Sequence, residues 1–475
     1  MFFWFLVLGA GAFFRFYHLD LESLWLDEGY AVEMAGRTVM ETFRLLSQDL
    51  HPPLYTLSLH GWIQLFGRSE TALRAFSALF GVLLIPLVYR LARHLFDAPA
   101  ARYAALFTSF SLFHVYYAQE ARPYTFLVFL SALSFYCFVR LLETDKKRYQ
   151  VGYIFFTTCM FYTHSFGIFT VFAQNIIFLR HFLCRRARGV GFMHWLLLQS
   201  ILGFLCSPWI FITIKFGSSM KDNWISRPTL GTLLEALRQY AGGMRLLVAS
   251  GALVLWGLWD SFRKKQSAGA EALVLWGGVV FLTPFLVSLI WVPIFYPRYM
   301  IASTLPLLIL TGRGVAALRP VLAQRIAAGV LLLFCLNGLY QNDKRVDKEQ
   351  WCEAVGVLNA DSKADDLVIL NSRGEAVLTY YLENKDLEVR VFPIMKDRFA
   401  RVYSWNDIYV TPKNIGELAE MTRGRGRVWL IQSHNYDEKG LTDKTMAELF
   451  GAPLFHRKYF GVVLSLYGRA GEPAA

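Results

Sequence analysis

The feature that most constrains this chain is a series of long apolar stretches that recur from the N-terminus to about residue 341. A helix that crosses a bilayer needs about 20 mostly apolar residues. Single stretches that meet this criterion lie at residues 1–19, 71–92, 103–119, 123–142, 192–214, 244–262, 271–295, 298–318 and 325–341. Charged residues make up only 18% of the chain, against about 25% in soluble domains. We therefore expect a polytopic α-helical membrane protein.

Residues 150–179 contain no Lys, Arg, Asp or Glu and are too long for one spanning helix. Basic clusters stand on both sides of this stretch, one ending at Arg148 and one beginning at Arg180. Because basic loops face the cytoplasm, an even number of crossings must separate the two clusters. We predict two short spans with a bend near residues 163–167, which gives about eleven transmembrane helices.

The loops between the predicted spans differ in charge according to their side. The loops at 90–102, 140–149, 180–194, 260–271 and 313–325 together carry 17 basic and 5 acidic residues, whereas the opposite loop, 20–70, carries 3 basic and 8 acidic residues. The positive-inside rule makes the five basic loops cytoplasmic. With eleven spans, the N-terminus is then cytoplasmic and the C-terminus extracytoplasmic. The compact loops favour a bacterial inner (plasma) membrane, which makes the outer face periplasmic.

The net charge of +12 therefore reports mainly topology. Because the basic residues lie in several short loops and form no continuous stripe, we expect no nucleic-acid partner. Two basic stretches lie elsewhere, Arg398 with Arg401 and Arg423 to Arg427. We interpret them as a solvated face or as contacts to an anionic acceptor or lipid.

The composition changes near residue 342. Residues 342–475 carry 19 basic and 20 acidic residues and alternate short strand-like runs with helical segments. Strands are predicted at 366–370, 388–392, 427–431 and 462–467, and helices at 349–359, 374–383 and 441–450. We expect two domains, a transmembrane domain (1–341) and a small C-terminal α/β domain on the outer face (342–475).

The first outer loop, residues 20–70, carries two groups of candidate functional residues. Asp27 and Glu28 follow Trp25, a residue type that favours the membrane interface. The alternative reading of this acidic pair is a helix start, because carboxylates favour a first helical turn. His51 precedes two prolines and Tyr55, and the prolines hold His51 in an extended turn.

Two further groups lie in other outer loops. Glu120 and Arg122 stand in a very short turn, where a local ion pair is the alternative reading. Arg298 and Tyr299 follow 26 residues without charge, and an arginine at that depth needs an anion or access to water. His164, at the predicted bend, is a candidate too, with a packing role as the alternative. Carboxylates accept protons and guanidinium groups bind phosphate, so the outer face suits a reaction with a phosphate leaving group.

The motifs that carry these residues resemble the GT-C class of integral membrane glycosyltransferases. The similarity is closest to glycosyltransferase family 39, the superfamily of dolichyl-phosphate-mannose protein mannosyltransferases and lipid A aminoarabinose transferases. It covers about residues 1–340 and rests on six motifs in order: SLWLDEGY (23–30), HPPLYTLSLHGW (51–62), SETALRAFSALFGVLLIPLVYRLARHLF (69–96), YYAQEARPYTF (116–126), YTHSFGIF (162–169) and YPRYMIASTLP (296–306).

The resemblance implies a hexosyl- or mannosyltransferase-like enzyme that takes a sugar from a polyprenyl-phosphate donor in the outer leaflet. Asp27 corresponds to the family's catalytic Asp, with Glu28 as its neighbour, and His51 would help to place the donor phosphate. Some relatives carry an Arg shortly after the acidic pair, where this chain has Gly29 and Tyr30. The phosphate contact is therefore expected from Arg122 or Arg298. A single displacement would invert the anomeric centre and pass the sugar to a protein, lipid or glycan acceptor.

Three other functions fit part of the sequence. A transporter or flippase of lipid-linked sugars also needs many spans, but it more often places ionisable residues in mid-membrane. A polymerase or ligase of surface polysaccharide belongs to the same chemical class. A structural anchor for the tail leaves the acidic motif without a role. Asp27, Glu28 and His51 are residue types that bind divalent ions, but their spacing gives no specific support for a metal cofactor.

Overall fold

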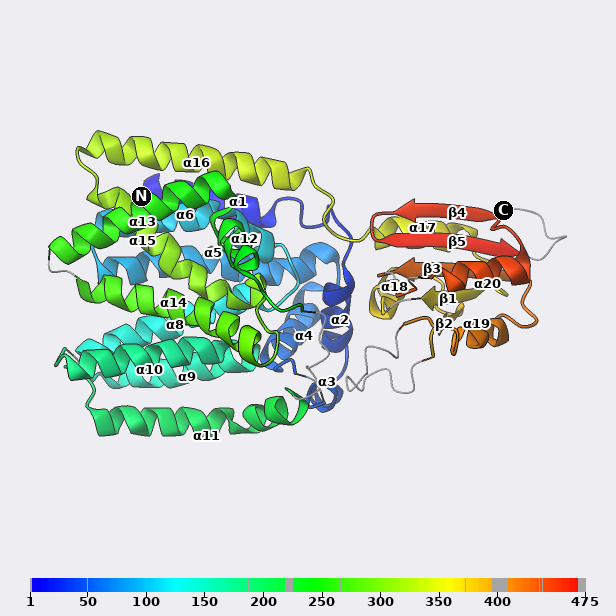
Figure 1. Ribbon diagram of the computed structural model, residues 1–475, viewed down its shortest axis with the longest axis horizontal. Coiled ribbons are helices and arrows are strands. Elements are labelled where there is room, and N and C mark those ends of the chain that lie inside the picture. Colours follow the sequence, from blue (N-terminus) through cyan, green and yellow to red (C-terminus); the bar gives the residue numbers. More distant parts are fainter. Residues whose placement is uncertain are drawn as a thin grey trace. The chain divides into compact units, whose positions relative to one another are not determined.

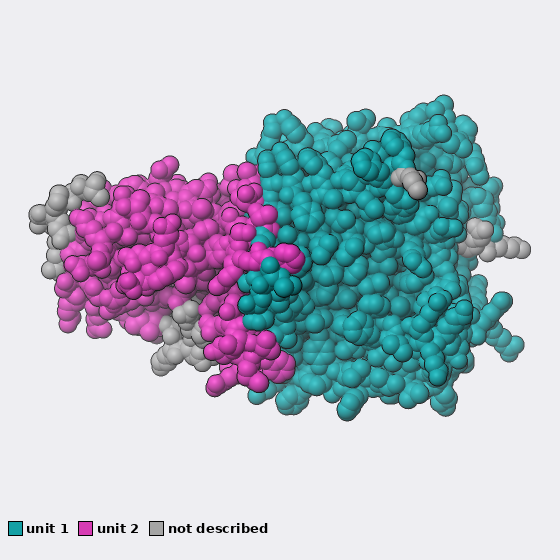
Figure 2. All heavy atoms as spheres, turned by 180° about the vertical axis from the view of Figure 1, so that it is seen from behind, with its two compact units in different colours: residues 1–19, 49–65, 72–345 teal, residues 20–48, 66–71, 346–475 magenta. Residues whose placement is uncertain are grey.

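The computed structural model describes residues 2–48, 50–186, 188–217, 225–264, 267–371, 373–394, 409–434, 436–437 and 439–468. The chain forms two compact units, which Figure 2 shows in different colours. Unit 1 comprises residues 1–19, 49–65 and 72–345, and unit 2 comprises residues 20–48, 66–71 and 346–475. Much of the acidic outer loop thus belongs to the same unit as the C-terminal domain. The predicted division at 341/342 did not anticipate this grouping.

Unit 1 is built from helices. They are α1 (Phe2–Phe16), α4 (Leu54–Phe66), α5 (Glu70–Leu95), α6 (Ala98–Phe110), α7 (Leu112–Ala118), α8 (Tyr124–Glu143), α9 (Lys147–Thr163), α10 (Gly167–Leu183), α11 (Phe192–Gly217), α12 (Leu230–Ala241), α13 (Met244–Arg263), α14 (Ser267–Ile290), the 3-10 helix η2 (Pro297–Ser303), α15 (Thr304–Ala317) and α16 (Val321–Asp343). α5 begins with two residues of unit 2. Figure 1 shows α8, α9 and α10 running beside one another.

The long apolar helices make this an integral membrane protein. Within the described ranges, seven helices are long and apolar enough to cross a bilayer, and α1 and α10 are shorter apolar helices. Residues 150–179 form the predicted pair of helices, α9 and α10, with an extended residue, His164, between them. The number of eleven crossings stays a prediction.

Two predicted spans are interrupted. The stretch 103–119 is divided between α6 and α7, because Ser111 between them has an extended backbone. The stretch 298–318 begins as the 3-10 helix η2 and becomes α-helical only at Thr304.

Unit 2 contains a five-stranded sheet in the order β2-β1-β3-β5-β4. The strands are β1 (Leu367–Asn371), β2 (Glu388–Val391), β3 (Arg427–Ser433), β4 (Phe455–Tyr459) and β5 (Val462–Gly468). β1 pairs in parallel with β2 and β3, whereas β5 runs antiparallel to β3 and β4. Parallel neighbours require crossover connections, and helices provide them. The predicted α/β character is thus confirmed, while β4 was missed.

The helices of unit 2 come from two parts of the chain. The C-terminal part supplies α17 (Trp351–Asp361), α18 (Glu375–Tyr381), α19 (Ile415–Met421) and α20 (Leu441–Phe450). The outer loop supplies α2 (Leu26–Ala35) and α3 (Val39–Leu46), and α2 packs against α18. α19 was not predicted. Leu367, Val428 and Leu430 are fully buried in a core that α19 and α20 cover with Leu418 and Met446.

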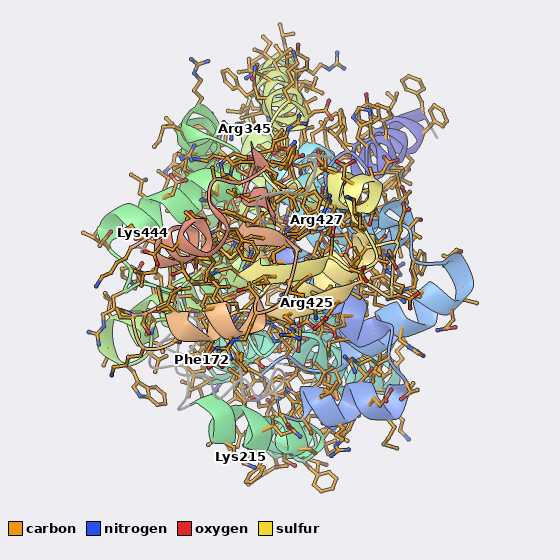
Figure 3. The ribbon with its side chains drawn as sticks, turned by 90° about the vertical axis from the view of Figure 1, so that its right-hand side faces the viewer. Phe172, Lys215, Arg345, Arg425, Arg427 and Lys444 are labelled. Atoms are coloured by element: carbon orange, nitrogen blue, oxygen red, sulfur yellow. The ribbon has the colours of Figure 1, made fainter. Side chains whose placement is uncertain are left out.

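The basic stretch Arg423 to Arg427 is largely structural (Figure 3). Arg427 is buried and its Nε donates to Asp366 Oδ1 at 3.0 Å, while Trp429 Nε1 donates to the other oxygen of Asp366 at 2.8 Å. Arg425 pairs with Glu388. Arg425 and Arg427 therefore form ion pairs within unit 2, a role that the sequence interpretation did not include. Arg398 and Arg401 lie outside the described residues.

α15 approaches its neighbours through small residues. A Cβ on Gly312 would stand 2.6 Å from the backbone nitrogen of Ala104 in α6, and one on Gly314 would stand 2.0 Å from the carbonyl oxygen of Leu253 in α13. Small residues allow helix backbones to approach closely in membranes, where packing replaces the hydrophobic effect as the driving force. α15 is therefore held tightly between α6 and α13.

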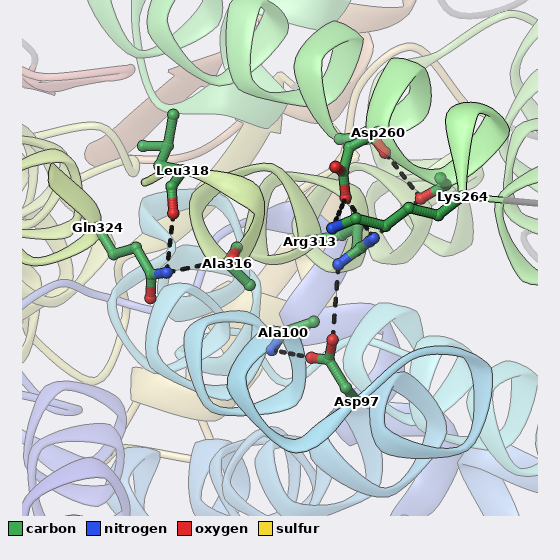
Figure 4. A network of polar contacts seen from close by, with 10 residues as sticks. Asp97, Ala100, Asp260, Lys264, Arg313, Ala316, Leu318 and Gln324 are labelled. Atoms are coloured by element: carbon green, nitrogen blue, oxygen red, sulfur yellow. Dashed lines mark hydrogen bonds and ion pairs between the residues drawn. The ribbon is translucent and has the colours of Figure 1, made fainter. Parts of the chain in front are cut away.

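A polar network joins the same three helices near the basic loops (Figure 4). Arg313 of α15 is buried, and its Nη2 donates to Asp260 Oδ2 of α13 at 2.6 Å. Its Nη1 lies 3.5 Å from Asp97, whose carboxylate caps α6 by accepting the N–H of Ala100. Lys264 also pairs with Asp260, at 2.9 Å. Because Asp260 and Arg313 are each 4% exposed, this pair fixes the helices to one another.

Candidate functional site

The first group of candidate residues lies at the N-terminus of α2 in unit 2. The backbone N–H of Trp25 donates to Glu28 Oε2 at 3.4 Å, the carboxylate half of a capping box. Lys348 Nζ lies 3.5 Å from the same oxygen, and Glu28 is fully buried. Glu28 therefore stabilises the helix start, which matches the alternative reading of the acidic pair.

Asp27, the neighbouring acid, has a different environment. It occupies the first turn of α2, where the helix dipole favours a negative charge, and it is half-buried while Glu28 is fully buried. Of the two predicted catalytic carboxylates, Asp27 is thus the one with access to solvent. This difference favours Asp27 as the group that meets a substrate.

A third carboxylate, Glu349, lies near Asp27. Glu349 accepts a hydrogen bond from the backbone N–H of Leu26, receives Trp351 Nε1–H at 2.6 Å and pairs with His434 Nε2 at 3.1 Å. Burial raises the pKa of Glu349, and the negative charge of Asp27 adds to the rise, although His434 and the hydrogen bonds oppose it. The carboxyl groups of Asp27 and Glu349 are thus close enough for their charges to interact.

The second group lies in unit 1, at turns between helices. Arg122, in the turn between α7 and α8, and Arg298, in η2, are 6% and 9% exposed. Their Cζ atoms lie 5.8 Å and 5.6 Å from the centre of the same ring, that of the fully buried Tyr124. Arg298 also lies 4.8 Å from the ring centre of Tyr296. Aromatic faces attract guanidinium groups, so these rings hold two cations close together.

We call Arg122, Tyr124, Tyr296 and Arg298 the arginine–tyrosine cluster, and His164 lies against it. Its ring lies 5.2 Å from that of Tyr299 and 6.1 Å from that of Tyr124. Burial lowers the pKa of His164 to about 3, with smaller contributions from the neighbouring His51, Arg122 and Arg298. The neutral ring therefore adds no positive charge to the cluster, and its Nδ1 accepts the N–H of Phe166 at 3.2 Å.

The structure thus brings together most of the predicted donor-binding residues. His51, Arg122 and Arg298 lie within electrostatic range of His164, and the ring of Tyr299 lies close to both His164 and Arg298. Glu120 is buried in the same turn as Arg122, whose N–H donates to the carbonyl oxygen of Glu120. Tyr55 is buried in α4, and its ring contacts Phe76 at 5.7 Å.

Two features of these sites were missed by the sequence reasoning. Tyr124 is part of the motif at 116–126, but no role was predicted for it, because its place between Arg122 and Arg298 depends on tertiary packing. Lys348 and Glu349 lie near the start of the predicted C-terminal domain, and no role was predicted for them. The available signal was the charged run Asp347-Lys348-Glu349 shortly after the last span.

A metal site finds no support in this geometry. Among the described residues, no group of three or more His, Cys, Asp or Glu side chains is placed to hold a metal ion. The charges of the arginine–tyrosine cluster suit an anion instead.

The comparisons with known proteins agree with this picture. Residues 50–212 match the family model described as dolichyl-phosphate-mannose-protein mannosyltransferase. The fold is similar to that of ArnT from Cupriavidus metallidurans, solved in the apo state (TM-score 0.67, 14% identity) and bound to undecaprenyl phosphate (TM-score 0.67, 13% identity), and each match covers 97% of both chains. It is also similar to an oligosaccharyltransferase from Archaeoglobus fulgidus in complex with Zn and sulfate (TM-score 0.58, 11% identity), covering 91% of this chain and 68% of that one.

No curated protein matches the sequence significantly. The family match and the structural matches together confirm the resemblance that the motifs predicted, and the chain has the fold of the GT-C class.

Proposed function

We propose that this GT-C-class membrane protein transfers a sugar from a polyprenyl-phosphate donor to an acceptor at the outer face of the membrane. The proposal rests on the arginine–tyrosine cluster, in which two nearly buried guanidinium groups flank one ring. Guanidinium groups in such a position suit the recognition of a phosphate. ArnT from Cupriavidus metallidurans, which shares the fold, has been solved with undecaprenyl phosphate bound.

In this proposal the cluster binds the donor phosphate. Arg122 and Arg298 each offer a planar fork of N–H donors, which suits bidentate contact with phosphate oxygens. As the bond between sugar and phosphate breaks, negative charge grows on the phosphate, and fixed positive charge stabilises it. His51 and Tyr299 contribute to the same site. His164 is neutral and packs against the rings of Tyr124 and Tyr299.

Asp27 is the proposed general base. It takes the proton of the acceptor hydroxyl or amine as the nucleophile attacks the anomeric carbon. The polyprenyl phosphate leaves from the opposite side, so one displacement inverts the anomeric centre. Protein, lipid and glycan acceptors all present suitable hydroxyl or amine groups. In this scheme Glu28 supports the helix that carries Asp27.

The test uses the purified full-length chain in liposomes with a panel of undecaprenyl-phosphate sugars and candidate acceptors. Release of undecaprenyl phosphate is measured. We expect Asp27→Asn to reduce turnover at least about 100-fold while the protein still folds, since losing a charged group at such a site typically costs about 3–4 kcal/mol. Asp20→Asn, an exposed acid of the same loop, serves as the matched control and should be fully active.

Two results would contradict the proposal. Near-normal turnover of Asp27→Asn would remove Asp27 as the base. Movement of the intact donor across the bilayer, with no release of undecaprenyl phosphate, would instead favour the transporter reading.

A further inference from the structure

We propose that residues 347–353, just after the last span, form a positioning segment for the N-terminus of α2, with Glu349 as its central residue. This inference rests on the proposed role of Asp27 and assigns to the C-terminal domain a part in catalysis. All the residues involved belong to unit 2.

The positioning segment is bonded to the loop before α2 by side chains from both sides. Glu22 Oε1 accepts the backbone N–H groups of Asp347 and Lys348 at 2.7 and 3.1 Å. Ser23 Oγ accepts the N–H of Cys352 at 3.0 Å and lies 3.2 Å from a carboxylate oxygen of Glu353. Glu22 and Ser23 therefore connect the loop to both ends of the segment.

Glu349 makes the contact closest to the proposed base. It accepts the N–H of Leu26, the first residue of α2, directly before Asp27. The first N–H groups of a helix have no partner within the helix, so an acceptor from elsewhere fixes the direction in which the helix starts. Lys348 adds a second contact two residues further along α2, through Glu28. Asp27 is thus flanked on both sides by residues that the segment holds.

The positioning segment is itself attached to the sheet. Gln350 N–H donates to the carbonyl oxygen of Phe460, in the turn between β4 and β5, at 2.9 Å. Trp351 is fully buried and donates to Glu349. His434, which follows β3, reaches Glu349 from the other side. Contacts to the ends of β3 and β4 thereby fix the position of Glu349. Glu349 in turn fixes the position of Leu26, the first residue of α2.

The expected effect on catalysis comes from geometry. A shift of about 1 Å in a catalytic group can lower the rate about 100-fold, because the reacting atoms must meet in one orientation. A residue that only stabilised the fold would change the amount of active protein and leave the turnover of folded molecules unchanged.

The experiment compares Glu349→Ala, Glu349→Gln and the control Glu448→Gln, an exposed acid on α20 of the same unit. Hydrogen–deuterium exchange of the full-length protein in micelles is followed by peptide. For Glu349→Ala we expect at least about 10-fold faster exchange in residues 22–30 and unchanged exchange in β1 and β3. Unchanged exchange in 22–30, or equally faster exchange throughout unit 2, would overturn the proposal.

Kinetics on the same proteins give the second readout. We expect Glu349→Ala to lower kcat about 10- to 100-fold with less than a twofold change in the donor KM. Glu349→Gln, which keeps an oxygen acceptor for Leu26, should recover much of that loss. Normal kcat for Glu349→Ala beside an inactive Asp27→Asn would overturn the positioning role and leave the proposed function intact. A fully active Asp27→Asn would instead contradict the proposed function, whereas the exchange result would still test the segment.

Discussion

Gly29 of α2 lies against Val377 of α18 so closely that a Cβ on the glycine would stand 2.3 Å from Val377 Cγ2 and 3.1 Å from the Val377 backbone nitrogen. The two helices come from parts of the chain that are more than 300 residues apart. Only a residue without a side chain permits this approach, and Gly29 is two residues beyond Asp27. The same contact leaves no room for an arginine side chain at residue 29.

Substitution of Gly29 by alanine should therefore separate α2 from α18. We expect Gly29→Ala to lower the free energy of unfolding by about 1–3 kcal/mol, as overpacking usually does, and to lower turnover at least 10-fold. Gly356→Ala on α17 is the control, because its Cβ would meet nothing within 4 Å and alanine favours a helix. Thermal melting in detergent measures both, and equal melting temperatures for the two variants would argue against the close contact.

Arg298 should govern donor affinity. Charge-assisted hydrogen bonds contribute about 1.5–3 kcal/mol each, so we expect Arg298→Ala to weaken binding of undecaprenyl phosphate about 10- to 100-fold. Arg298→Lys should recover little, because an ammonium group lacks the planar array of donors. Binding is measured by titration of the lipid phosphate into the protein in micelles. Arg325→Ala, an exposed arginine of α16, should bind normally, and unchanged affinity in Arg298→Ala would exclude it from the phosphate site.

His164 should make unit 1 sensitive to acid. Burial holds its pKa at about 3 in the folded state, against an ordinary value of about 6.5, so below pH 6.5 the unfolded chain binds a proton that the folded chain does not. Stability is then lost as the pH falls from about 6.5 toward 3. We expect His164→Asn, which cannot charge, to show a smaller drop in melting temperature between pH 7 and pH 4.5 than the unaltered protein. Parallel pH profiles would contradict this assignment.

The buried pair of Asp260 and Arg313 should matter for stability and little for chemistry. Asp260→Asn leaves Arg313 without its shortest ionic contact, and breaking a buried pair typically costs about 3–5 kcal/mol. Lys264→Ala removes only a partly exposed partner of Asp260 and should cost less than about 1 kcal/mol. Melting curves in detergent distinguish the two. A smaller loss of stability for Asp260→Asn than for Lys264→Ala would contradict this prediction.

The helices of unit 1 could largely be predicted because their signals are local. Residues 150–179 illustrate this, since the absence of charge and the flanking basic clusters already required two helices, which α9 and α10 provide. The strands of the C-terminal part were predictable for the same reason, except for β4 (Phe455–Tyr459), whose three middle residues, His456, Arg457 and Lys458, are all polar and exposed.

The sites could be predicted only in part. The gathering of Arg122, His164 and Arg298 followed from their common position at helix ends on one side, but their arrangement around Tyr124 depends on side-chain packing that no spacing encodes. The grouping of α2 with the C-terminal domain rests on the close packing of Gly29 against Val377 and on single hydrogen bonds, such as those of Glu22, Ser23 and Glu349. Such bonds leave no periodicity in the sequence.

The shared unit of α2 and the C-terminal domain also has a consequence for synthesis. Glu28 leaves the ribosome 320 residues before Lys348, which at about 5–20 residues per second is a delay of roughly 15 to 60 s. During this interval the nascent chain holds its acidic helix without the partners that orient it. The contact between Glu28 and Lys348 can therefore form only after most of the chain has been synthesised. A chain released before residue 348 carries the acidic motif without this contact.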